Sequence, residues 1–209
     1  ETGRARFFTP PGTNMIHRLV FSLDGRYLAA ADNAYTLPQM SVAKDTRSTV
    51  RFWDVATRKE TLVFSTNEFP VSLMFSADAK SLVAGFNEGP VKLWRLDRPG
   101  EAATFLGHSG WTTGLAMLTN GQTLISASGD IRFWDVRTRR ENARPLSPRA
   151  GANCIALSPD GRRLAAGASD GRITIWDVAS HQEVATLSGH KEGVRQLAFT
   201  PDGDHLVSV

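Results

Sequence analysis

The stretch DGRITIWDV, residues Asp170–Val178, decides the fold because GDIRFWDV at Gly129–Val136 repeats its pattern about forty residues earlier. Both runs alternate apolar and polar side chains, which is the period of a half-buried β-strand. The same type of run ends in a tryptophan at four positions, which are Trp53, Trp94, Trp134 and Trp176. Their spacings of 41, 40 and 42 residues predict a structural unit of about 40 residues that recurs along the chain.

A second motif precedes each tryptophan run and adds a fifth copy. The copies are FSLDGRYLAA from Phe21, FSADAKSLVA from Phe75, LTNGQTLISA from Leu118, LSPDGRRLAA from Leu157 and FTPDGDHLVS from Phe199. Four copies contain Asp-Gly or Asn-Gly, which supplies the positive-φ residue of a tight hairpin turn. The second copy has Ala79 at the glycine position, so the same turn would carry a strain of about 1 kcal/mol there.

Each unit is predicted to contain short strands and no helix. In the fourth unit the predicted strands are 154–158, 163–167, 173–178 and 183–187. Alternation in the third of these strands places Ile173 and Ile175 on one face of the sheet, and Thr174 and Trp176 on the other. One such sheet has an apolar face on each side, and only stacking against neighbouring sheets buries both.

These motifs resemble the WD-repeat family over nearly the whole chain. The resemblance implies an all-β fold, a β-propeller of four-stranded antiparallel blades around a central channel. We expect four near-complete blades with partial strands at both ends, in a single domain over 1–209. The predicted segments are an outer strand at 1–9, blades at 13–66, 67–107, 108–148 and 149–189, and two strands of a further blade at 190–209.

The family also has a buried hydrogen-bond relay of His, Ser or Thr, Asp and Trp. The resemblance maps this relay in the third unit onto His108, Ser126, Asp130 and Trp134. Parts of it recur as Asp170 and Trp176 in the fourth unit and as His190 and Ser208 in the fifth. Because Ala166 stands at the serine position of the fourth unit, we expect a complete relay at most once and blades held chiefly by apolar packing.

The two ends of the chain are out of phase with the repeat. The segment 1–8 aligns with 56–63, and the last unit stops before its Asp and Trp. We expect a fragment of a longer propeller in which missing blades or a second chain complete the ring. The alternative is a five-bladed ring in which the first and last segments share a blade without a third strand, which would leave strand edges unpaired.

Composition argues against a disordered chain, a membrane span and a signal peptide. Of the 209 residues, 41% are hydrophobic and 22% are charged, which is typical of a globular protein. The sequence has no run of eighteen apolar residues and no apolar leader segment. The single cysteine, Cys154, cannot form an internal disulfide, so we expect a cytoplasmic location.

No set of residues predicts catalysis, a cofactor or a metal. Gly167–Gly171 matches G-x-S-x-G, but that nucleophile requires a strand-to-helix turn and a histidine partner. The five histidines lack metal-ligand spacing. We therefore expect a protein that is not an enzyme.

Two sets of residues are candidates for binding a partner. An insertion at Asn33–Ser48 carries Tyr35, Leu37 and Met40, and it is either a functional loop or a disordered excursion. Aligning the copies also superposes Met15, Phe69 and Trp111 at the entry to the first strand of three units. Two positions later stand His17 in the first unit, Asn153 in the fourth and Arg195 in the fifth. The large side chains resemble interface anchors, although filling gaps between blades explains them equally well.

The expected function is a non-catalytic scaffold that binds a protein or peptide on its loop-bearing face. Similar arginine-rich repeats in bacterial proteins are often attached to a kinase or another effector domain. One alternative is a propeller enzyme with a site at the channel mouth. Another is nucleic-acid binding through an arginine cluster, although the net charge of +3 is small; the cluster comprises Arg137, Arg139, Arg140, Arg144 and Arg149.

Overall fold

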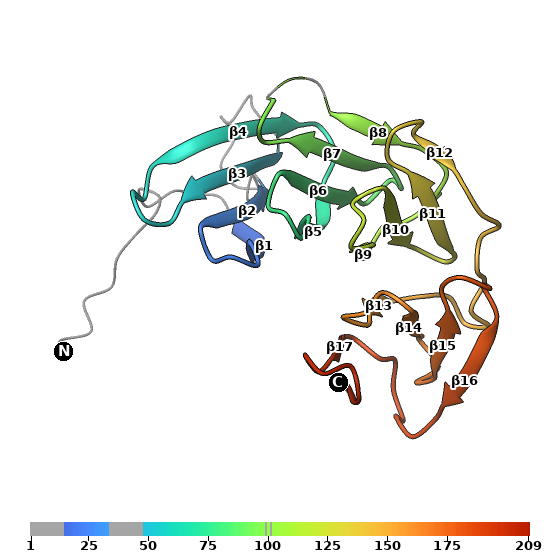
Figure 1. Cartoon of the computed structure of the whole chain (residues 1–209). Coiled ribbons are helices and arrows are strands. Elements are labelled where there is room, and N and C mark those ends of the chain that lie inside the picture. The colour runs from blue at the N-terminus through green and yellow to red at the C-terminus, as the bar shows by residue number, and fades with distance from the viewer. Residues whose placement is uncertain (1–14, 34–47, 99, 101) are drawn as a thin grey trace, which may run out of the picture.

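The computed structural model describes residues 15–33, 48–98, 100 and 102–209, which form five antiparallel sheets (Figure 1). These residues contain no helix, and hence none that could span a membrane. The all-β prediction is confirmed for this part of the chain. The expected outer strand at 1–9 and most of the insertion after Asn33 lie outside the described residues.

Four of the sheets have four strands each, paired in chain order. The first sheet contains β1 (Met15–Phe21), β2 (Tyr27–Asn33), β3 (Ser48–Asp54) and β4 (Glu60–Thr66). The second contains β5 (Pro70–Phe75), β6 (Ser81–Phe86), β7 (Val91–Arg95) and β8 (Ala103–Phe105). The third contains β9 (Gly114–Met117), β10 (Thr123–Ala127), β11 (Ile131–Asp135) and β12 (Arg140–Glu141).

The last two sheets follow the same order. The fourth contains β13 (Cys154–Leu157), β14 (Arg163–Gly167), β15 (Ile173–Asp177) and β16 (Glu183–Leu187). The fifth has two strands, β17 (Leu197–Phe199) and β18 (Leu206–Ser208). In Figure 1 the sheets stand side by side in an arc, with β5, β9, β13 and β17 toward a common centre and β4, β8, β12 and β16 outside. This is the arrangement of propeller blades.

Apolar side chains fill the seams between neighbouring sheets. Ile173 packs with Val194 toward the fifth sheet, whereas Trp176 packs with Phe133 and Ile125 toward the third. The predicted division of β15 into two faces is therefore confirmed. Since burying one large apolar side chain contributes about 1.5–3 kcal/mol, the seams supply most of the attraction between blades.

The repeated turn between the first two strands is closed by the same amide-to-carbonyl bond in all five sheets, and in four of them a hydroxyl also donates to an aspartate. In the first copy the Ser22 hydroxyl donates to Asp24 Oδ1 at 2.6 Å, and the Gly25 amide donates to the Ser22 carbonyl at 2.9 Å. The bond from Ser22 holds the pKa of Asp24 below its ordinary value. Gly25 has φ 68°, and Ala79 adopts φ 55° at the same place in the second copy. The strained turn predicted at Ala79 therefore forms.

Candidate functional site

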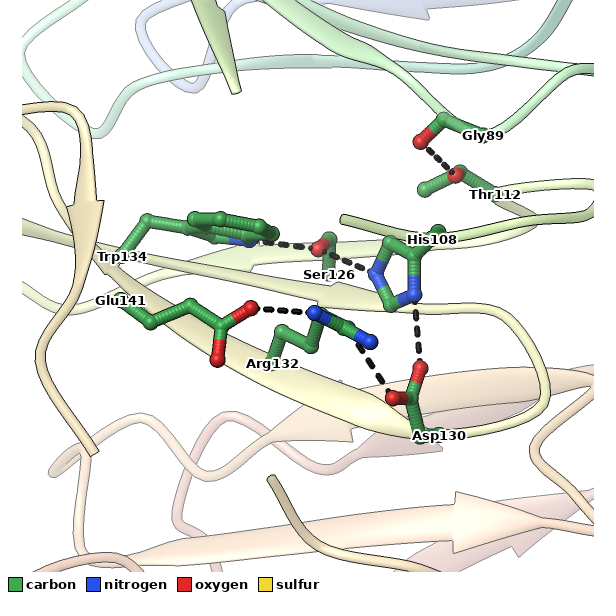
Figure 2. Close-up of polar contacts among 8 residues, drawn as sticks. All are labelled: Gly89, His108, Thr112, Ser126, Asp130, Arg132, Trp134 and Glu141. Atoms are coloured by element: carbon green, nitrogen blue, oxygen red, sulfur yellow. Dashed lines mark hydrogen bonds and ion pairs between the residues drawn. The ribbon is translucent and has the colours of Figure 1, made fainter. Parts of the chain in front are cut away.

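The four predicted relay residues of the third unit lie in one hydrogen-bonded chain (Figure 2). The Trp134 indole Nε1 donates to Ser126 Oγ at 2.7 Å. Ser126 Oγ in turn lies 2.7 Å from His108 Nε2, and His108 Nδ1 lies 2.7 Å from Asp130 Oδ1. Because a carboxylate only accepts, His108 donates from Nδ1 to Asp130. Nε2 of the neutral imidazole is then an acceptor, and the Ser126 hydroxyl donates to it.

Arg132 and Glu141 extend this chain to the edge of the sheet. Arg132 Nε donates to Asp130 Oδ2 at 2.9 Å, and its Nη1 donates to Glu141 on β12 (Figure 2). Burial lowers the pKa of His108 below 6.5, and this effect outweighs the opposing attraction of Asp130. A neutral imidazole fits the acceptor role of Nε2. The buried polar groups of His108, Ser126 and Trp134 thus all have hydrogen-bond partners.

The other sheets carry only parts of the relay within the described residues. His190 Nε2 lies 2.7 Å from Ser208 Oγ at an exposed position. Asp170 accepts a bond from the Arg172 amide at 3.1 Å. In the first sheet the Trp53 indole nitrogen is buried without a hydrogen-bond partner among the described atoms. Among the described residues, the contacts of all four relay positions occur together in the third sheet.

Thr112 fixes the loop after His108 onto the preceding blade. Its amide donates to the Phe86 carbonyl at 3.0 Å, and its buried hydroxyl donates to the Gly89 carbonyl at 2.9 Å (Figure 2). The Thr112 carbonyl accepts a bond from Ser72 Oγ at 2.6 Å. Sequence reasoning missed Thr112, Ser72 and Gly89 because no motif shared by the copies contains them. Together they hold the adjacent Trp111 in a defined place.

An aromatic row crosses the first three blades at the leading rim, which is the end where β1, β5 and β9 begin. The row consists of His17, Phe69 and Trp111. The His17 and Phe69 rings are edge-to-face with centroids 4.8 Å apart, and those of Phe69 and Trp111 are 6.3 Å apart. Trp111 is 61% exposed. Asn87 Oδ1 accepts a bond from the Phe69 amide at 2.9 Å, which anchors the middle of the row.

A cavity of about 880 Å³ lies between the five inner strands β1, β5, β9, β13 and β17. His17, Asn153 and Arg195 line it, so these three predicted residues converge on one space from three blades. Arg18 lines it as well. The register of β1 shifts between Ile16 and Arg18, and His17 and Arg18 are both among the residues that line the cavity.

The remaining predicted residues fall elsewhere. Met15 is the first residue of β1, whereas Tyr35, Leu37 and Met40 lie outside the described residues, and their role stays a prediction. Ser169 of the G-x-S-x-G match lies in the turn between β14 and β15 and donates to the Ala150 carbonyl at 3.1 Å. The described part of the chain has no cluster of metal ligands. The arginine cluster is exposed on and around β12.

Three segments of the chain match the family model of the WD domain, G-beta repeat. The matches cover residues 100–135, 146–177 and 181–209. The chain contains WD40 repeats. The matched segments include β11 and β15, the two strands whose tryptophan motifs define the repeat.

Three known proteins from a plant are similar to part of this chain. Pre-mRNA-processing factor 19 homolog 2 of Arabidopsis thaliana is 35% identical over 97 residues, which are 46% of this chain and 18% of that protein. Protein FIZZY-RELATED 1 of the same plant is 31% identical over 91 residues, or 42% and 19% of the two chains. Cell division cycle 20.1, cofactor of APC complex, also from Arabidopsis, is 29% identical over 106 residues, or 49% and 23%.

The chain thus spans about a fifth of the length of these relatives. Their WD40 repeats support the expected family. The expected likeness to bacterial proteins in particular has no support among them, because all three are plant proteins.

Proposed function

We propose that this set of WD40 repeats is a non-catalytic scaffold that binds another protein at the leading rim. The aromatic row carries the proposal, because an exposed tryptophan on a rigid scaffold is typical of interface anchors. Filling a gap between blades does not account for Trp111, since 61% of it stays exposed. The name of one relative, a cofactor of APC complex, describes a protein that acts with a larger assembly.

The cavity supports binding over catalysis. General acid–base work needs a carboxylate or histidine placed against a second reacting group. Apart from Cys154 and the permanently charged Arg18 and Arg195, His17 is the one titratable side chain among the described cavity residues, and its ring contacts Phe69. Burial raises the pKa of Cys154, which makes its thiol a poor nucleophile. A cytoplasmic location stays a prediction.

The test compares Trp111→Ala with Leu23→Ala. Leu23 is 86% exposed in the turn between β1 and β2, at the other end of the blade, so it is a matched surface control. We expect both variants to melt like the wild type, because exposed substitutions change stability by about 0.5 kcal/mol or less. Partner capture from the cells that make the protein should fall only with Trp111→Ala. A lower melting temperature with unchanged capture would assign Trp111 to packing instead.

A further inference from the structure

The cavity between the inner strands contains arginine side chains and no acidic residue. Arg18 and Arg195 line it from the first and fifth blades, and Asn153 and Gln196 add neutral polar groups. No Asp or Glu is among the described residues that form its walls. A cleft lined by one sign of charge concentrates its electric field and attracts ions of the opposite sign.

Arg18 has donors to spare after its contacts within the protein. Its Nε donates to the Val71 carbonyl at 2.6 Å, and its Nη1 donates to the His17 carbonyl at 2.9 Å. A guanidinium has five N–H groups, so three are left once these two bonds are counted. Both bonds are to neutral carbonyls, and the described residues provide no ion pair to Arg18. The side chain is therefore held in place, and none of the described acidic residues pairs with its charge.

Arg195 offers a second cation. Its backbone amide donates to the Val209 carbonyl at 2.7 Å, whereas its side chain is exposed and makes no ion pair with a described residue. Acidic residues occur in the loops that lead into β5 and β17, but they do not cancel this charge. Glu68 pairs with Lys92, and Glu192 does not line the cavity.

We propose that the cavity receives carboxylate side chains from an acidic segment of the partner, while the aromatic row holds an adjacent apolar residue. This inference rests on the proposed docking at the leading rim, and His17 joins the two regions because it contacts Phe69 and lines the cavity. Guanidinium groups bind carboxylates through paired hydrogen bonds. The apolar part of the walls, including Leu73 and Ile155, suits the methylene groups of glutamate better than a doubly charged phosphate.

The size of the cavity agrees with such a ligand. Its 880 Å³ lies within the range of roughly 300–1,000 Å³ that is usual for ligand sites. Several side chains of an extended peptide fit this volume. Because the charge attracts before contact, binding should weaken steeply as the salt concentration rises.

The experiment measures fluorescence anisotropy of the full chain with four octapeptides of one Gly-Ser host that carry a neutral dye. Their four variable positions hold glutamate, glutamine, lysine or phosphoserine. We expect the glutamate peptide to bind at least about tenfold more tightly than the glutamine peptide and the lysine peptide not to bind, since charge-assisted hydrogen bonds are the strong ones. Equal affinity for the glutamate and glutamine peptides, or binding of the phosphoserine peptide alone, would overturn the proposal.

Arginine variants test whether the glutamate peptide binds in the cavity. Arg195→Gln and Arg18→Gln should each weaken the glutamate peptide about fivefold or more, the loss expected for one partly exposed charged bond. Arg137→Gln removes the same charge from an exposed position after β11, at the other end of the blade, and should leave the affinity unchanged. Arg195→Glu should abolish binding of the glutamate peptide. Because Arg195 is exposed, this variant still tests the site if Arg18→Gln does not fold. Equal effects of Arg137→Gln and Arg195→Gln would overturn the site.

Different results would contradict the carboxylate site in the cavity and the proposed docking at Trp111. If the glutamate peptide does not bind but partner capture still depends on Trp111, the carboxylate site is wrong and the docking face stands. If Arg195→Gln weakens the peptide but Trp111→Ala leaves partner capture intact, the cavity binds acidic peptides and the aromatic row is not the anchor.

Discussion

Replacing Ser126 by alanine tests how much the single complete relay stabilises the protein. Ser126 is fully buried, and its hydroxyl bonds both the Trp134 indole and His108 Nε2 at 2.7 Å. The change leaves these two buried groups without partners, and each such group costs about 1–3 kcal/mol. Three other blades already hold alanine at the matching place in β2, β6 and β14, so alanine itself fits the strand.

We therefore expect Ser126→Ala to lower the free energy of unfolding by about 3 kcal/mol. For a chain of this length the melting temperature should fall by about 6–12 °C. The assay is denaturant unfolding, together with hydrogen exchange of the Trp134 indole proton by NMR. The control is Ser147→Ala, because Ser147 is exposed and has no side-chain hydrogen bond among the described residues. A loss no larger than that of the control would refute the role of the relay.

Three further predictions concern stability. The pKa of His108 is lower in the folded protein than in the unfolded chain, so the unfolded chain binds more protons as the pH falls below about 6.5. The stability that the neutral His108 contributes should be fully present above that pH and should decline as the pH falls toward the folded pKa. His108→Gln should flatten this decline when unfolding is measured over a range of pH. Ala30→Ser should give the buried Trp53 indole an acceptor in the register that Ser126 has with Trp134, and raise the unfolding free energy by about 1 kcal/mol. Gly89→Ala should lower the free energy of unfolding by more than about 2 kcal/mol, because Gly89 has φ 105° and the new methyl group would meet the His108 carbonyl oxygen. Gly25→Ala should lower it by only about 1 kcal/mol, since Ala79 already adopts the same turn. Similar losses for both glycine variants would contradict the close contact.

Strand positions could be predicted because turn residues mark their limits. The expected strands at 163–167 and 183–187 coincide with β14 and β16, since Asp160-Gly161 and the Asp177–Ser180 turn bound them. The Asp130 contact was predicted by the resemblance, although its hairpin is two residues shorter than that of the fourth blade. In the structure Arg132 holds the other oxygen of the Asp130 carboxylate, so the shorter hairpin still presents it to His108.

The contacts between blades could not be predicted from the repeat alone. Aligned copies place Phe69 and Trp111 at equivalent positions, but the contact of their rings depends on the distance between blades. The bond from Thr112 to Gly89 joins residues of different units that no shared motif contains. The lining of the cavity could not be predicted either, because alternation of the strand would have placed His17 and Arg18 on opposite faces, whereas both line the cavity beside the irregularity in β1.

The most direct test of the docking face is site-specific photo-crosslinking from position 111. A photoreactive phenylalanine analogue replaces Trp111 in one protein and Leu23 in another, and both are irradiated in extract from the cells that make the chain. The account predicts a discrete covalent adduct with another protein from position 111 and none from position 23. Adducts of equal yield from both positions, or an adduct from position 23 alone, would contradict it.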